Sequence, residues 1–212
     1  AFLDLDHFKE VNDVHGHNVG DLLLQLVVER IRHRIRSLDT AARLGGDEFV
    51  LLMHGLLVKD MAARLTAILH DLSQPYTIEG KQIHVSGSAG LAVFPTDGTD
   101  YDSLLKHADM AMYQAKTSGR NSLSLFNAAM ATESRSRYQL ESALRLAIEN
   151  QELSVVYQPQ VSLGDGRVVG MEALLRFHSK ELGMVSPDQF IPVAEETGLI
   201  HRIGDWVLEQ VA

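Results

Sequence analysis

The chain has 212 residues, 45% of them hydrophobic, with no cysteine and a formal net charge of −9. This size fits one full domain with part of a second, and the absence of cysteine excludes disulfides and thiolate metal sites and agrees with a reducing, cytoplasmic location. The acidic charge argues against a DNA- or RNA-binding protein, and the absence of any long apolar run predicts no membrane segment.

The first part of the chain alternates between strand and helix patterns. An apolar stretch at the start ends on two acids, and Gly45-Gly46 is typical of a hairpin turn between two short strands. A second turn is expected at Glu79-Gly80. The predicted elements, in chain order, are a strand at 1–6, a helix at 22–35, strands at 40–44 and 48–53, a helix at 61–72, a strand pair at 76–95, a helix at 101–119 and a strand at 122–126. This order favours an α+β sandwich with a mainly antiparallel central sheet over residues 1–126.

The second part of the chain begins with a polar segment of helical pattern. Residues 127–151 are interpreted as a connecting helix, and a new domain pattern occupies residues 152–212. This pattern begins with a strand hairpin that turns at "GDGR", followed by a helix with Ser186 as N-cap and Pro187 in its first turn. Both ends of the sequence read as the interior of a longer protein.

Three acids of the first part could lie together. Asp4 is placed at the end of the first strand, and Asp47 and Glu48 at the tip of the hairpin, so the three carboxylates converge if those strands are neighbours. Oxygen ligands of this kind suit Mg²⁺ or Mn²⁺. The two glycines allow a tight turn and a close approach by a phosphate. The alternative for these four residues alone is an ordinary hairpin with solvated acids.

Several separated motifs resemble one family. The stretches "FLDLDHFKEVND", "GHNVGD", "RLGGDEF" and "YQAKTSGRN" occur in the order seen in the GGDEF family, the diguanylate cyclases. The resemblance implies a nucleotidyl-cyclase-like (ferredoxin-like) sandwich with Mg²⁺ or Mn²⁺ bound by Asp4, the Leu5 carbonyl, Asp47 and Glu48. It also implies that Asp47 accepts the proton of the 3′-hydroxyl, with Glu48 assisting.

The same resemblance implies roles in binding GTP. Asn12 and Asp21 would read the guanine base, and the backbone N–H groups of His7 and Phe8 would contact phosphate at a helix N-terminus. Two cations four apart on a helix end, Lys116 and Arg120, would also contact phosphate. The implied reaction condenses two GTP to cyclic di-GMP with release of pyrophosphate, and it requires a homodimer because each domain holds one GTP.

A further motif, "RSLD", precedes the hairpin. Without its context, Arg36 is a cation at a helix C-terminus and Asp39 is a solvated acid. However, Asp39 lies six residues before Gly45, and by the resemblance the two residues form an inhibitory site for the product, cyclic di-GMP.

The second part resembles another family. The stretches "YQPQ", "EALLRF" and "FIPVAEETGLI" are similar to the start of EAL-family cyclic di-GMP phosphodiesterases, which are built on a (β/α)8-type barrel. The resemblance implies Glu172 as a metal ligand and Gln158 and Arg176 as substrate contacts. Since about 250 residues are typical of such a barrel, the residues present form only a fragment of it, and we expect no phosphodiesterase activity from this chain alone.

Other functions stay open at this point. The first domain could be a GTP-binding regulator of the adjoining phosphodiesterase, or a module that binds cyclic di-GMP through Arg36 and Asp39. A region preceding Ala1 could carry the input signal and tether the parent protein to a membrane.

Overall fold

The structure, a computed structural model, describes all residues from 1 to 212. It divides into two units, Ala1–Ala131 (unit 1) and Thr132–Ala212 (unit 2). None of the helices combines the length and the apolar character needed to span a membrane. The domain boundaries expected near residues 126 and 152 stay predictions.

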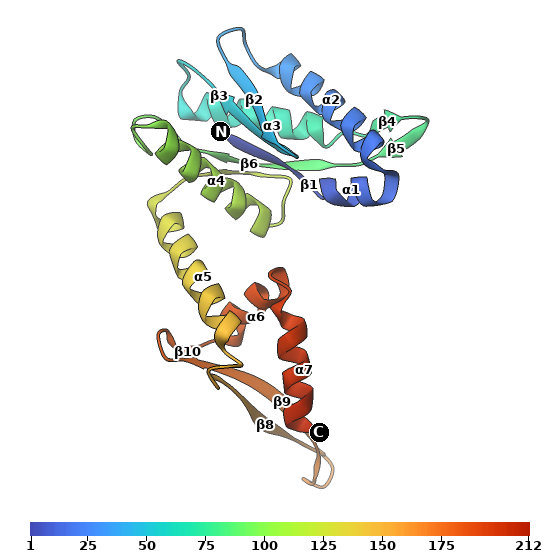
Figure 1. Cartoon of the computed structure of the whole chain (residues 1–212), viewed down its shortest axis with the longest axis vertical. Helices are drawn as coiled ribbons and strands as arrows, with labels where there is room; N and C mark the ends of the chain where they lie inside the picture. Colours follow the sequence, from blue (N-terminus) through green and yellow to red (C-terminus); the bar gives the residue numbers. More distant parts are fainter. The chain divides into compact units, whose positions relative to one another are not determined.

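Unit 1 is built on a five-stranded sheet with the strand order β2-β3-β1-β6-β7 (Figure 1). Three of its four strand pairs are antiparallel, and only β6 and β7 run parallel. The elements of unit 1 are β1 (Phe2–Asp6), α1 (Phe8–His15), α2 (His17–Arg34), β2 (Thr40–Gly45), β3 (Glu48–Leu52), α3 (Val58–Leu72), β4 (Tyr76–Ile78), β5 (Lys81–Ile83), β6 (Ser86–Leu91), α4 (Tyr101–Thr117) and β7 (Leu123–Leu125). The mainly antiparallel α+β sheet predicted from the sequence is therefore confirmed.

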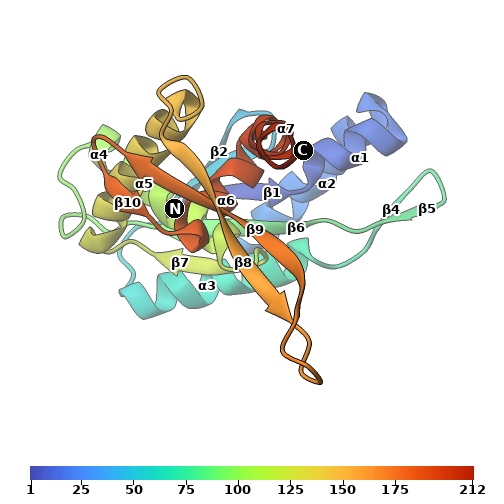
Figure 2. The ribbon, with the colours of Figure 1, turned by 90° about the horizontal axis from the view of Figure 1, so that it is seen from below.

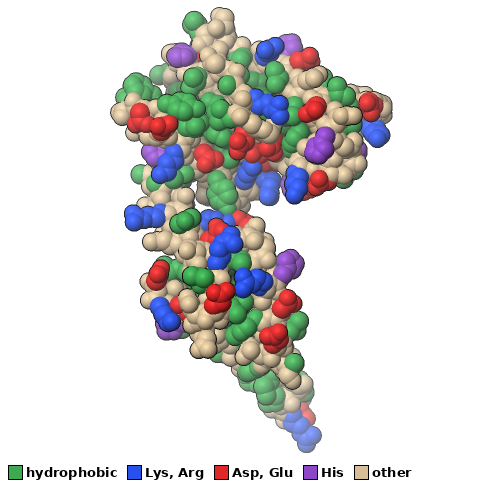
Figure 3. Space-filling view, viewed as in Figure 1, with side chains coloured by type: hydrophobic (Ala, Val, Ile, Leu, Met, Phe, Trp, Pro, Cys, Tyr) green, Lys and Arg blue, Asp and Glu red, His purple; other side chains and the backbone are tan.

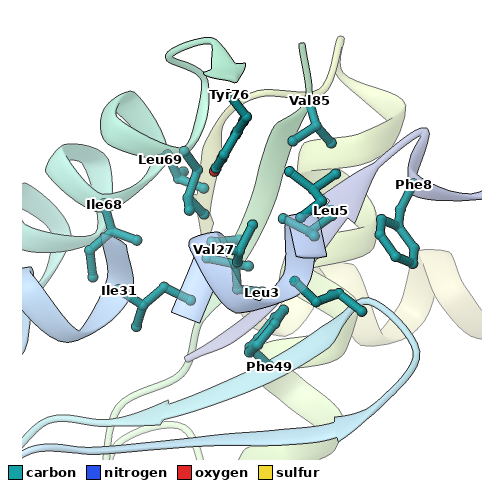
Figure 4. Close-up of a cluster of buried hydrophobic side chains, with 14 of the residues drawn as sticks. Leu3, Leu5, Phe8, Val27, Ile31, Phe49, Ile68, Leu69, Tyr76 and Val85 are labelled. Atoms are coloured by element: carbon teal, nitrogen blue, oxygen red, sulfur yellow. The ribbon is translucent and has the colours of Figure 1, made fainter. Parts of the chain in front are cut away.

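The two faces of the sheet are covered by different helices. Successive residues of a strand point to opposite faces, so Leu3 and Leu5 of β1 enter one core and Phe2 enters another. In the first core these leucines and Phe49 of β3 pack against α2 and α3 (Figure 4). The second core places Phe2 against Ala108 and Met112 of α4. Asp4 and Asp6 therefore share the face of β1 that α4 covers.

The structure differs from the sequence prediction at three places in unit 1. The segment before residue 22 forms two helices, α1 and the start of α2, separated by Gly16 at a φ of 88°. The predicted strand pair at 76–95 is a separate hairpin, β4–β5, followed by β6 in the main sheet. The first strand has the predicted extent, but Asp4 lies in its interior and not at its end.

Unit 2 contains α5 (Ala128–Leu146) from Thr132 onward and a three-stranded antiparallel sheet. Its strands are β8 (Leu153–Val161), β9 (Val168–Ser179) and β10 (Gly183–Val185), and its further helices are α6 (Pro187–Glu196) and α7 (Leu199–Val211). The predicted hairpin at "GDGR" is the long β8–β9 ribbon seen in Figure 2. In the hydrophobic core of unit 2, the rings of Phe177 and Phe190 pack edge to face, with centroids 5.7 Å apart.

Candidate functional site

The acidic site lies on the α4-covered face of β1. Asp4 is only 7% exposed, and it faces Glu48 directly across the β1–β3 pair. The Lys116 ammonium, from the last turn of α4, lies 2.6 Å from Asp4 Oδ1. Acidic side chains lie beside Lys and Arg side chains on the surface of unit 1, between α4 and α1 (Figure 3). The strand pairing thus confirms that the segments carrying these acids are neighbours.

Burial controls the charge of Asp4. Loss of solvent raises the pKa of the Asp4 carboxyl to about 6, Lys116 opposes this rise, and the nearby Asp47 and Glu48 add to it. Excess negative charge close to a buried carboxylate favours either a proton or a cation at that position. Lys116 supplies one such cation in the ligand-free chain.

The residues fit a divalent metal by their chemistry. Asp4, Asp47 and Glu48 offer hard oxygen donors, as Mg²⁺ and Mn²⁺ prefer. The Leu5 N–H donates to the Asp47 carbonyl at 3.3 Å, which places the hairpin tip beside β1. The full convergence expected from the sequence is not seen, because no three His, Asp or Glu side chains already surround one metal position.

The predicted base-reading residues lie on the first two helices. Asn12 is half-buried on α1, and Asp21 is exposed near the start of α2. Gly20 makes room for Asn12, because a Cβ at position 20 would lie 1.9 Å from Asn12 Oδ1. A side chain at this position would therefore displace the Asn12 amide from its place beside α2.

The predicted phosphate contacts come from the start of α1, the last turn of α4 and the turn after it. His7 is the N-cap of α1 in a left-handed conformation, with φ at 59°, so the N–H groups of His7 and Phe8 lie at the helix start. Lys116 is in α4, but Arg120 is not on the helix as expected, since α4 ends at Thr117. Arg120 has a φ of 61°, and its N–H donates to the Ala115 carbonyl at 3.0 Å.

The "RSLD" residues form a closed ion pair. Arg36 donates from Nε and Nη2 to Asp39 at 3.1 and 2.7 Å, and from Nη2 to the His54 carbonyl at 2.6 Å. Asp39 also accepts from the Arg36 and His54 N–H groups. The Arg36 guanidinium, more than any other group, holds the pKa of Asp39 well below its usual range. The Asp39 side chain has no exposed surface, whereas that of Arg36 is 33% exposed.

The residues predicted for the EAL part lie on one ribbon. Gln158 of β8 pairs directly with Glu172 of β9, and Arg176 lies four residues further along β9. This spacing puts all three on the same face of the ribbon, opposite the face that carries Phe177. Gln158 and Glu172 are exposed and Arg176 is half-buried.

Three residues that the sequence analysis did not single out contribute to these sites. Asp6 is buried and accepts hydrogen bonds from Ser86, Ser88 and Asn121. Gly20 admits Asn12, and His54 completes the ion pair of Asp39. The alternation in "FLDLD" could have placed Asp6 beside Asp4, whereas nothing in the sequence links His54 to Asp39.

Known proteins resemble the chain over almost its whole length. It is 46% identical over 209 residues to MucR of Pseudomonas aeruginosa, a bifunctional diguanylate cyclase/cyclic di-GMP phosphodiesterase, covering 99% of this chain and 30% of that protein. It is 39% identical over 211 residues to the cyclic di-GMP phosphodiesterase PdeR of Escherichia coli, covering 100% of this chain and 32% of that protein. The chain therefore spans less than a third of the length of these relatives.

Solved structures match unit 1. The GGDEF domain of YfiN from Pseudomonas aeruginosa has a TM-score of 0.58 and 38% identity, covering 59% of this chain and 80% of that one. The GGDEF domain of DgcB from Caulobacter crescentus, in complex with c-di-GMP, has a TM-score of 0.52 and 29% identity, covering 58% of this chain and 74% of that one. Residues 1–122 match the family described as diguanylate cyclase, GGDEF domain, and residues 141–212 match the EAL domain. The chain belongs to the GGDEF family, and its GGDEF domain is followed by the start of an EAL domain.

Proposed function

We propose that unit 1 is a diguanylate cyclase domain that condenses two GTP to cyclic di-GMP. The observation that carries this proposal is the buried Asp4 carboxylate, which lies opposite Glu48 and within 2.6 Å of Lys116. Carboxylates that can bind a cation, Asp4 and Glu48, thus lie at one sheet face with an ammonium group that can bind a phosphate, that of Lys116. This combination suits phosphoryl transfer, in which catalysis depends on positioning and on neutralising phosphate charge.

The residues of the chain divide the work of the proposed reaction. Asn12 and Asp21 bind the guanine edge, and Lys116, Arg120 and the N–H groups at the start of α1 hold the phosphates. A Mg²⁺ or Mn²⁺ ion held by Asp4, the Leu5 carbonyl, Asp47 and Glu48 would neutralise phosphate charge and favour ionisation of the 3′-hydroxyl.

The proposed chemistry joins two nucleotides. The 3′-oxygen of one GTP forms a bond to the α-phosphorus of the other, the bond to pyrophosphate breaks, and Asp47 accepts the hydroxyl proton. Two such steps close the ring and release two pyrophosphates. Because one domain holds one GTP, two copies of the domain must face each other, and the active species is a homodimer.

Turnover of GTP tests the proposal. The chain with GTP and Mg²⁺ is expected to form cyclic di-GMP, and Asp47→Ala is expected to lower the rate by about 10²–10⁴-fold, as for loss of a general base. Nucleotide products are separated by chromatography, and GTP binding is measured by calorimetry on both proteins. Equal turnover by both would contradict the role of Asp47. Binding without turnover in the wild-type chain would instead support a regulatory GTP-binding domain.

We also propose that the "RSLD" segment is an inhibitory site for cyclic di-GMP. The exposed part of the Arg36 guanidinium would contact the guanine and phosphate groups, while the covered Asp39 carboxylate holds Arg36 in place. The fork of two hydrogen bonds between them fixes the plane of the guanidinium, which favours stacking on a base.

Replacement of Arg36 by lysine tests this site. Arg36→Lys keeps a positive charge beside Asp39, so a buried unpaired carboxylate is avoided, but it removes the planar fork. We expect the affinity for cyclic di-GMP to fall about tenfold or more, and the ratio of inhibited to uninhibited synthesis rates to approach one. Unchanged binding in a calorimetric titration would remove Arg36 from the inhibitory site.

A further inference from the structure

Asp6 is a buried carboxylate for which the proposed chemistry has no role. It is 3% exposed and lies two residues after Asp4, on the same face of β1. Its Oδ1 accepts a hydrogen bond from Ser88 Oγ at 2.8 Å, and its Oδ2 accepts one from Ser86 Oγ at 2.6 Å. Both of these bonds stay within the sheet, because Ser86 and Ser88 belong to β6, the neighbour of β1.

A third bond of Asp6 leaves the sheet. Its Oδ2 also accepts the backbone N–H of Asn121 at 3.1 Å, a residue 115 positions later in the chain. Asn121 follows α4 and directly precedes the segment that leads into β7. Asp6 therefore joins β1 to the turn at the end of α4.

This turn has an unusual backbone. Arg120 and Asn121 have φ angles of 61° and 46°, in the left-handed region that asparagine adopts more readily than most residues and that arginine seldom adopts. A conformation of this kind persists only where surrounding contacts hold it. Two hydrogen bonds do so here: the Arg120 N–H donates to the Ala115 carbonyl, and the Asn121 N–H donates to the Asp6 carboxylate.

We infer that Asp6 is a positioning residue that fixes Arg120 for contact with the phosphates of GTP. Asp4 contacts Lys116 directly, and Asp6 holds the turn that carries Arg120. Two carboxylates of β1 therefore position the two cations of the proposed phosphate site. The inference rests on the proposed GTP site, and it assigns a role to a buried acid that does not itself contact nucleotide.

Comparison of GTP with guanosine tests the inference. Asp6→Ala removes the acceptor for the Asn121 N–H, so the preference for GTP over guanosine is expected to fall about tenfold or more, while guanosine affinity is unchanged. Asp6→Asn can still turn its amide oxygen toward Asn121 and its NH₂ toward Ser88, and it is expected to restore most of the preference. Both affinities are measured by calorimetry on the full chain, in Mg²⁺ and again in EDTA, where metal ligation by the adjacent Asp4 contributes nothing.

Two further variants separate positioning from general stability. Ser88→Ala removes a hydrogen bond that Asp6 makes within the sheet, and it should leave the GTP-to-guanosine preference unchanged. Arg120→Ala should lower the preference, and the double variant with Asp6→Ala should lower it no further, because both act on the same contact.

The outcomes distinguish this inference from the proposed function. An unchanged preference in Asp6→Ala, additive losses in the double variant, or no effect of Arg120→Ala would each overturn the positioning role while leaving GTP binding intact. Absence of GTP binding by the wild-type chain would overturn the proposed function, and the role of Asp6 with it.

Discussion

Asp4→Asn is expected to abolish cyclic di-GMP synthesis while making the ligand-free GGDEF domain more stable above pH 7. The loss of activity should reach about 10²–10³-fold or more, because the neutral amide cannot supply the charge that a divalent cation needs. The gain in stability arises because the wild-type carboxylate is buried, with a pKa raised to about 6. Ionising it in the folded state therefore costs about 3 kcal/mol relative to the unfolded chain.

The pH dependence of this effect has a definite sign. Between the unfolded pKa of about 4 and the folded value of about 6, the folded wild-type chain binds more protons than the unfolded chain. The unfolding free energy of the wild type therefore falls as pH rises through this range and reaches its full loss above pH 6. Asp4→Asn has no carboxyl to ionise and does not lose this stability. Its unfolding free energy should therefore exceed that of the wild type only slightly at pH 4 and most at pH 7–8.

The measurement uses hydrogen exchange of the β1 and β6 amides in EDTA, because the only tryptophan, Trp206, lies in α7 of unit 2. The exposed Asp60, at the start of α3, provides a matched control, and Asp60→Asn should change stability by less than about 0.5 kcal/mol. A variant that is less stable than wild type at pH 8, or that keeps full synthesis, would contradict the expected conflict between stability and function at Asp4.

Gly90→Ala is expected to destabilise unit 1 by about 3 kcal/mol. A Cβ at this position of β6 would lie 2.0 Å from the Ala108 carbonyl oxygen and 2.1 Å from the Met112 nitrogen, both backbone atoms of α4. No side-chain rotation relieves such a contact, so α4 must move away from the sheet. Because α4 carries Lys116, GTP affinity should fall together with stability.

Another glycine of the same strand supplies the control. A Cβ on Gly87 would meet its nearest atoms at 3.4 Å, an ordinary contact, so Gly87→Ala should change stability by no more than about 1 kcal/mol. Urea unfolding is followed by exchange of unit 1 amides, with Trp206 fluorescence as an internal reference for unit 2. Equal stability of the two variants would show that α4 is free to shift.

Local patterns were sufficient to predict much of unit 1. The Gly45-Gly46 turn, the pairing of its two strands and the antiparallel character of the sheet follow from periodicity and turn chemistry. Periodicity does not reveal helix α1, because its sequence is mostly polar and only Phe8 and Val11 are buried, and only the family resemblance implies a helix start at these residues. The β4–β5 hairpin was merged with β6 because periodicity does not say which sheet a strand joins.

The candidate site was predicted less completely than the fold. Of the residues named from the family motifs, Asp4, Glu48 and Lys116 lie near one another where the structure brings β1, β3 and α4 together. The roles of Asp6 and His54 depend on hydrogen bonds between distant parts of the chain, from Asn121 to Asp6 and from His54 to Asp39. Such contacts depend on tertiary structure, and no local spacing reveals them.

The alternation of apolar and acidic residues along β1 has a consequence for the accuracy of the site. A slip of one residue in the pairing of β1 would turn Leu3 and Leu5 toward α4 and press Asp4 and Asp6 into the core beneath α2 and α3. The cost of burying two carboxylates there excludes that arrangement. Burial of Leu3 and Leu5 in the hydrophobic core thus fixes the register of β1. That register in turn places Asp4 opposite Glu48 and Asp6 beside β6.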